Sequence, residues 1–453
     1  MMRKEKGSVT IVLALMMTMF LMFCLVLVEG VRVYFFRTNA MQAVDLAEFS
    51  VLSEFQKELF EQYEVFFLDL DYEQGTEQIG ILEQRIRTYL EKNTEYVTTG
   101  SLFASNFKRA TDAGGNVFFT QAVNAQKTDR GYGILEDLLG NEESVEVDSI
   151  DLQKLLNEQE EKAEAILEGL KSDEEGVGWN IDVELPDISF PSVDALTEEV
   201  FGGLEGISKK SIDINERIEK RTLIKGIGKK EKGLKGDQQL FHQYIMEHCN
   251  FYGASNENVW KDALEYQVEY MIAGEQSDIE NLEDVMWRIF LLRSGGNYLF
   301  YKQDTEKQRE ARLKAKMVVG LLEEGVLLET VKEMFLIAMA IEEGISETKF
   351  IFAGGKVPLY QKGIFSGFLL GYESYLKLLL SVEGREKKIL RCMDVIEMEC
   401  RIQSGYKNLR MDHCVDGFEL QWNYRFDRLF TKLPFSGGGI YESQITRKIY
   451  YEY

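Results

Sequence analysis

The chain has 453 residues and a formal net charge of −24, with 45% hydrophobic and 12% aromatic residues. This composition supports at least one large packed core and excludes a wholly disordered chain, and the length suggests two or three domains. The negative charge argues against a nucleic-acid partner, because the phosphate backbone would be repelled.

The first predicted element is a run of twenty uncharged residues, 9–28. As a helix it matches a bilayer hydrocarbon core of roughly 30 Å, so the lipid bilayer is an expected partner. Arg3, Lys4 and Lys6 precede it, which predicts a cytoplasmic tail at residues 1–8 and an outer location for the rest. The alternative is a cleaved signal peptide, but no small-x-small cleavage site follows the run. We therefore expect a single-pass cell-membrane protein that keeps its first helix.

The helix is predicted to continue outside the membrane, because residues 31–60 contain neither proline nor glycine. From Val9 to Phe60 it would be about 78 Å long. Apolar residues recur at helical spacing in its outer half, at Val33, Phe36, Ala40, Val44, Ala47, Val51 and Phe55. Such a stripe must pack either on this protein's own outer domain or on another chain.

The junction after the span resembles the N-terminal region of TadE/TadG-like proteins, which are pseudopilin-like components of tight-adherence pilus systems. Glu29, Gly30, Arg32 and Asp45 occupy the matching positions. The resemblance implies a pilin-like helix and a role in pilus or secretion assembly. Glu29 has a second interpretation, as a headgroup-zone carboxylate paired with Arg32 three residues later. Prepilin cleavage is not expected, because the position that would need an acidic residue is Val12.

Residues 29–140 are predicted to form a helical stalk and a first extracytoplasmic region. Within it we expect a β-like run at 63–71, a helix at 79–92, a turn at 112–116, a helical segment at 116–124 and a loop at 130–133.

Residues 141–238 are predicted to form a charged linker. Its first part, 142–175, has a net charge of −10 and contains a helical pattern at 152–170. Residues 176–191 look extended, and residues 209–235 have a net charge of +6. We expect a solvated, protease-sensitive insertion; the alternative is a basic strip that contacts anionic wall polymer or lipid headgroups.

Residues 239–453 are predicted to form a helix-rich domain that ends in antiparallel strands. Helical patterns occur at 239–249, 259–273, 281–293, 307–323, 326–342, 365–382 and 386–402. Phe418, Leu420, Trp422, Tyr424 and Phe426 alternate with polar residues, and a last strand at 443–453 would pair with theirs. The fold class is therefore α+β, mostly helical.

This domain also resembles an uncharacterised family of Gram-positive envelope proteins with the same pilus-like N-terminus. The similar pieces are 269–274, 281–282, 353–358 and 391–396. The resemblance brings no activity with it.

A metal or catalytic site is hard to find in the sequence. His248-Cys249 and His413-Cys414 would offer four zinc ligands, but adjacent residues diverge on a helix and the usual spacings are absent. Four cysteines outside the span allow three pairings, and free buried thiols are the simpler expectation. Two Ser-x-x-Lys matches lack their companion motifs. We expect no cofactor, no metal and no catalytic residue.

Two functions remain. The favoured one is a non-enzymatic envelope component that assembles with pilus-like or other envelope proteins through its N-terminal helix. The alternative is a membrane-tethered cell-wall-modifying hydrolase or a metal-binding envelope protein, which would need a cluster of catalytic or ligating groups in one cleft.

Overall fold

The computed structural model describes residues 5–130, 151–172, 184–229, 236–254, 263–320, 325–358, 369–403, 407–429 and 439–451. The fold is α+β and mostly helical, with antiparallel strands near the C-terminal end, as expected. The chain forms two compact units, each described separately. Unit 1 comprises Met1–Asp129, Arg221–Leu234 and Ile396–Tyr453, and unit 2 comprises Arg130–Lys220 and Lys235–Val395.

Unit 1 is a sheet covered by helices. Its elements are α1 (Glu5–Leu52), α2 (Lys57–Tyr63), β1 (Leu68–Asp69), α3 (Ile79–Asn93), β2 (Thr98–Arg109), α4 (Asp112–Arg130), the end of α14 (Arg385–Gln403), β5 (Cys414–Asp427) and β6 (Ile440–Tyr450). β5 is the central strand, since it pairs antiparallel with β1, β2 and β6. The predicted pairing of the last two strands is confirmed, with Trp422 opposite Ile445.

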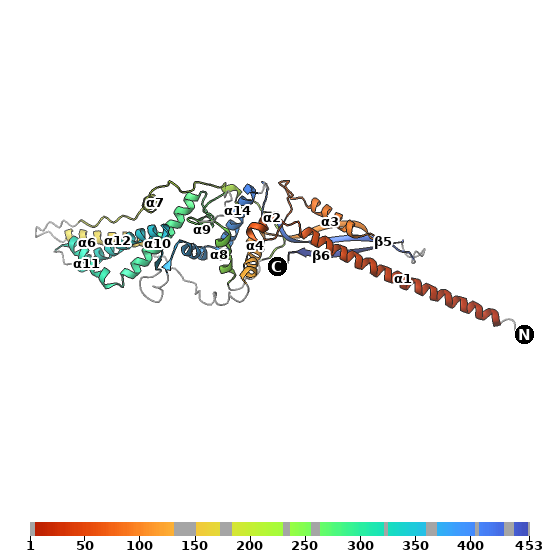
Figure 1. Ribbon diagram of the computed structural model, residues 1–453. Helices are drawn as coiled ribbons and strands as arrows, with labels where there is room; N and C mark the ends of the chain where they lie inside the picture. Colours follow the sequence, from red (N-terminus) through yellow and green to blue (C-terminus); the bar gives the residue numbers. More distant parts are fainter. Residues whose placement is uncertain are drawn as a thin grey trace. The chain divides into compact units, whose positions relative to one another are not determined.

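The core of unit 1 lies between the sheet and two helices. The alternating apolar residues of β5 are all buried, which confirms the predicted strand pattern. α3 contributes Leu82, Ile86 and Leu90, and the outer half of α1 packs beside it (Figure 1). The predicted extension of the first helix to Phe60 is wrong. α1 ends at Leu52, and the backbone N–H of Gln56 donates to the carbonyl of Phe67 at 2.8 Å, where the chain turns into α2.

Unit 2 is built from helices in near chain order. Its elements are α6 (Leu152–Ser172), α7 (Val193–Phe201), η1 (Ile214–Glu216), α8 (Asp237–His248), α9 (Gln267–Ala273), α10 (Asp278–Tyr301), α11 (Thr305–Val319), α12 (Gly325–Phe352), the short hairpin β3 (Val357–Pro358) and β4 (Leu369–Leu370), α13 (Tyr372–Val382) and the start of α14. α12 is the central helix, since α6, α7, α10 and α11 all pack on it. A capping box of Ser277 and Glu280 begins α10.

The division into units differs from the domain boundaries expected from the sequence. We expected residues 239–453 to form one domain, but Ile396–Tyr453 belongs with the N-terminal residues. The reason is strand pairing, because the only long partner of β2 among the described strands is β5. The expected linker at 141–238 is likewise divided, since Arg221–Leu234 is part of unit 1.

Candidate functional site

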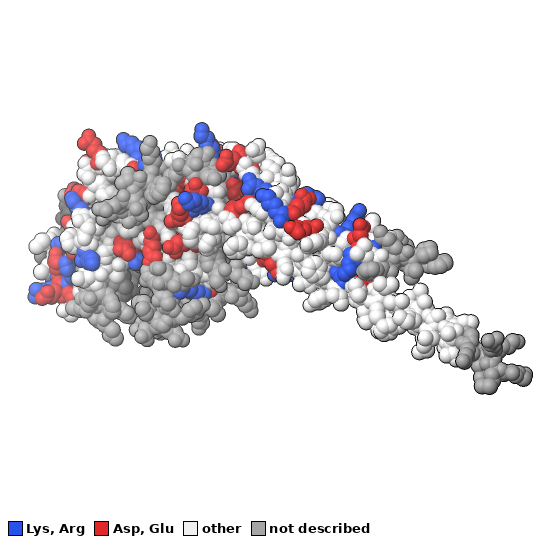
Figure 2. Space-filling model, turned by 45° about the vertical axis from the view of Figure 1, so that its right-hand side comes forward, with Lys and Arg blue, Asp and Glu red and all other residues white. Residues whose placement is uncertain are grey.

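The first half of α1 is an apolar rod. The large apolar side chains of residues 9–28 are between 41% and 71% exposed, and none is covered by the described protein. In Figure 2 this part of the helix is white, without charged side chains. By length and composition α1 is long and apolar enough to cross a membrane, and it is the only such helix in the described residues.

The second half of α1 has a buried face made of small and medium side chains. Ala40, Ala43, Val44, Ala47 and Val51 are each at most 1% exposed, and they pack into the core of unit 1. Of the two partners that the sequence allowed for the apolar stripe, the structure therefore provides the protein's own outer domain. Small residues at these positions let the helix approach the sheet and α3 closely.

The opposite face of α1 also has large apolar side chains. Val31, Tyr34, Phe35, Met41, Leu46 and Phe49 are between 45% and 76% exposed. The helical spacing in the sequence indicated only the buried stripe, and this second face was not predicted. α1 therefore has one face in the core of unit 1 and large apolar side chains exposed on the opposite face.

The four motif residues at and after the end of the span lie in different surroundings. Glu29 accepts from Arg32 at 3.2 Å, which confirms the pairing considered from the spacing. Arg32 also donates to the carbonyl of Asp427 at 3.4 Å, at the end of β5. Asp45 pairs with Arg447 of β6 at 3.2 Å. Gly30 has open space where a Cβ would be, so no close approach requires a glycine there.

The two His-Cys dipeptides do not gather into a metal cluster. Within the described part of the chain, no three His, Cys, Asp or Glu side chains are arranged to hold a metal ion. The ring of His248 packs on Tyr244 at 4.5 Å, and Cys249 is buried beside Cys392. Cys414 lies opposite Asp69 in the sheet, next to the buried His413. All five cysteines are free thiols.

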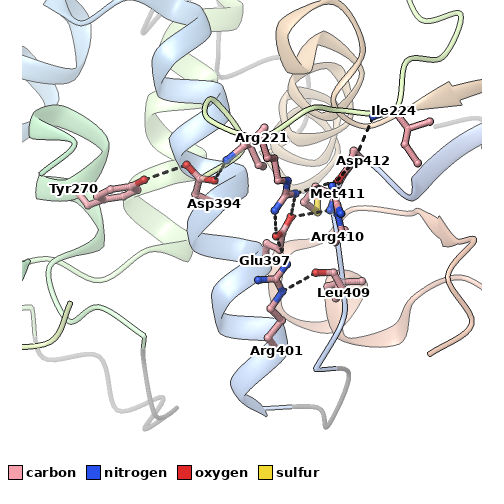
Figure 3. Close-up of polar contacts among 11 residues, drawn as sticks. Arg221, Ile224, Tyr270, Asp394, Glu397, Arg401, Leu409, Arg410, Met411 and Asp412 are labelled. Carbon is pink, nitrogen blue, oxygen red and sulfur yellow. Dashed lines mark hydrogen bonds and ion pairs between the residues drawn. The ribbon is translucent and has the colours of Figure 1, made fainter. Parts of the chain in front are cut away.

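A buried ionic network in unit 1 was not foreseen from the sequence (Figure 3). Arg221 donates to both carboxylate oxygens of Glu397, at 2.5 and 2.6 Å, and to Asp412 at 3.1 Å. Arg401 donates to Glu397 at 2.5 Å, and Arg410 to Asp412 at 3.0 Å. Burial raises the pKa of Asp412, but the hydrogen bond from Arg410 and the charges of Arg221 and Arg410 outweigh it and leave the pKa below its ordinary value.

This network holds a segment that we expected to be a solvated insertion. The segment after Arg221 is also fixed by Asp112, whose two carboxylate oxygens accept from the N–H groups of Gly226 and Gly228 at 2.7 and 2.8 Å. A Cβ at Gly226 would lie 2.3 Å from Asp112 and from the carbonyl of Phe107, so glycine is required there. Residues 221–229 are therefore an anchored strap; residues 230–235 lie outside the described part.

Unit 2 contains buried ionisable groups that satisfy one another. Glu269 accepts from the hydroxyl of Tyr372 at 2.6 Å and from the backbone N–H of Tyr252 at 2.8 Å. Burial raises the pKa of Glu269 to about 7, in spite of these hydrogen bonds, which lower it. Lys388 lies 2.7 Å from the ring of His242, and burial lowers the pKa of Lys388 to about 8. Lys388 is only 1% exposed, so a substrate could not reach its amine without rearrangement.

These elements define an α+β protein whose first helix is long and apolar enough to cross a membrane. The chain belongs to the DUF5702 family, described as a family of unknown function, which it matches over residues 192–364 and 365–426. No curated protein and no solved structure matches the chain. None of these comparisons provides a link to TadE/TadG-like proteins.

Proposed function

We propose that this protein is a non-enzymatic, membrane-anchored component of the cell envelope that assembles with other membrane proteins through α1. Residues 9–28 are the membrane span. The basic residues before the span favour a cytoplasmic N-terminus, so that both units lie outside the membrane. The partners are pilus-like or other envelope assembly proteins, as the pilin-like N-terminal motif implies.

The exposed apolar face on the outer half of α1 supports this proposal. We call Met41, Leu46 and Phe49 the assembly face; their exposed fractions are 45%, 52% and 76%. Burying a large apolar side chain contributes about 1.5–3 kcal/mol. A partner helix that covered this face would therefore be bound with a favourable free energy. The face is continuous with the span through one unbroken helix, which favours a partner that also enters the membrane.

In unit 2, Arg293 and Glu347 form a buried ion pair at 2.8 Å, and Glu269 and Lys388 are each held by neighbouring polar groups. Polar groups that are satisfied inside the fold in this way make a structural role the simpler interpretation.

Photocrosslinking in cells tests the proposal. A benzophenone amino acid is placed at Phe49, and a matched probe replaces Met317 of α11, which is 84% exposed. We expect a specific adduct from position 49 only, with a protein that has its own membrane-spanning helix, identified by mass spectrometry. The additional change Leu46→Asp should abolish most of that adduct, whereas Met317→Asp should not.

Two results would contradict the proposal. The first is equal or absent crosslinking at positions 49 and 317. The second concerns orientation: a cysteine in place of Met317 should react with a membrane-impermeant thiol reagent on intact cells, and labelling only after lysis would place unit 2 inside.

A further inference from the structure

The direction of α1 relative to the sheet places one end of unit 1 next to the span. Arg32 contacts the carbonyl of Asp427, Asp45 pairs with Arg447, and the hydroxyl of Tyr451 donates to the carbonyl of Leu52 at 2.9 Å. The first contact is at the end of β5, and the others follow β6 toward its C-terminal end. α1 and β6 therefore run in the same direction, and the end of β5 and the start of β6 lie beside the first turn after the span (Figure 1).

Aromatic and apolar side chains surround α1 at this end of unit 1. Phe35 packs on Tyr96, which precedes β2, with ring centroids 6.0 Å apart. Phe36 packs on Phe426 at 4.6 Å. The exposed members, which we call the collar, are Tyr34, Phe35, Tyr96, Leu429 and Ile440, and each is more than half exposed. They come from α1, the α3–β2 connection and the hairpin, so three separate parts of the chain present apolar surface at one end of the unit.

The depth of the collar follows from the helix rise. At 1.5 Å per residue, Arg32 and the Asp427 carbonyl that it contacts lie about 6 Å beyond Val28, and Phe35 lies about 10 Å beyond it. The interfacial layer on each side of the hydrocarbon core is roughly 5–8 Å thick. Helical side chains also lean toward the N-terminus, which on α1 is the membrane side. The collar therefore lies at the depth of the lipid headgroups.

The side chains at the collar end of unit 1 are of the types that occur in the lipid headgroup layer. Tyrosine rings are enriched at membrane interfaces, and arginine side chains reach the headgroups. Arg428, which directly follows β5, lies over the ring of Tyr441 at 5.5 Å. Figure 2 shows basic and acidic side chains side by side where the white helix leaves the rest of the unit. Glu29, Glu95 and Asp427 are also found here, so the charges are mixed and give no reason to expect a preference for anionic lipid.

We propose that the collar is a lipid-binding surface, inserted among the headgroups of the membrane that α1 crosses, so that unit 1 rests on the bilayer. The inference depends on the membrane span of the proposed function. Embedding the collar would fix the orientation of unit 1 relative to the membrane and hold the assembly face at a constant height above it.

Depth-dependent fluorescence quenching tests this surface. The full chain, with Cys24→Ala, receives a single labelling cysteine as Tyr96→Cys or Leu429→Cys and is reconstituted in phosphatidylcholine vesicles. An environment-sensitive dye on that cysteine is quenched by lipids with a nitroxide near the headgroup end of the acyl chain. Phe20→Cys near the middle of the span is the positive control, and it is probed with lipids that have the nitroxide near the methyl end of the acyl chain. Phe49→Cys is the matched negative control on the same unit, since position 49 lies about 32 Å beyond Val28.

We expect quenching at positions 20, 96 and 429, and none at position 49. Quenching at 20 with none at 96 and 429 would overturn the collar and leave the span intact. No quenching at 20 would overturn the span itself and the collar with it. Quenching at all four positions would also overturn the proposal, because the contact would not be confined to the collar.

Discussion

Units 1 and 2 are stabilised by different means. Unit 1 joins three stretches of sequence, and its strands and ion pairs connect distant residues: Arg221 and Glu397 are 176 positions apart. Unit 2 consists mainly of helices that follow one another, with local signals such as the capping box at Ser277. The structure of unit 2 can therefore be predicted from local sequence patterns, whereas the structure of unit 1 depends on single buried residues that pair over long distances in the sequence.

The largest loss of stability is expected when a charge is placed on the face of α1 that packs into the core of unit 1. Val44→Asp should cost more than about 4 kcal/mol and unfold unit 1, since Val44 is 1% exposed and an aspartate there has no partner. Hydrogen exchange on the full chain should show lost protection in α3 and β5, with α10 and α12 unchanged. Phe49→Asp on the exposed face is the control and should change stability by about 0.5 kcal/mol at most. Equal loss of protection in both units would mean that they do not fold independently.

The second-largest loss of stability is expected when the ionic network around Arg221 is broken. Arg221→Met leaves the buried carboxylates of Glu397 and Asp412 short of a cation, which typically costs about 3–5 kcal/mol. The strap at residues 221–229 should come free, and trypsin should then cut after Lys225 much faster. Lys220→Met, at an exposed neighbouring position, is the control and should not change that rate. Rapid cleavage after Lys225 in the unaltered protein would show that the strap is not anchored.

The smallest change in stability is expected from the titration of Glu269 in unit 2. Its pKa rises from 4.5 to about 7 on folding, so between these values the unfolded chain has lost the proton that the folded chain still holds. Stability should therefore fall as the pH rises from about 4.5 to 7, by roughly 3 kcal/mol in all. Hydrogen exchange of α9 amides should follow this slope. Glu269→Gln should flatten it, and the exposed Glu386→Gln should not.

Several elements could be predicted because their signals are local. The helix expected at 79–92 is α3, and the one expected at 386–402 is α14, each within one residue at both ends. The residues at 112–116, expected as a turn, have left-handed backbone angles at Ala113, Gly114 and Gly115. The alternation in β5 was readable because one face of that strand is buried and the other is partly exposed.

Other features have no local signal. β2 was missed because its alternation is interrupted by register shifts after Thr99 and after Ser105, and Asn106 has a positive φ of 54°. α1 ends at Leu52 without a glycine or proline, because Phe55 joins a cluster with Phe60 and Phe66. In the candidate site, the pairing of Glu29 with Arg32 followed from helical spacing. The pairing of Arg221 with Glu397 did not, because a basic run looks the same in a sequence whether its residues are solvated or buried.

The central position of β5 has a consequence for how the protein is made. A ribosome synthesises α1, α3 and β2 first, but β5 emerges about 300 residues after β2 ends. Throughout that interval β2 lacks its only long described partner, and the apolar faces of α1 and α3 lack the strand that completes their core. Unit 2 is finished almost entirely within the same interval, so it is expected to fold while unit 1 is still incomplete. A nascent chain of this kind would benefit from a chaperone that shields β2 until the last sixty residues arrive.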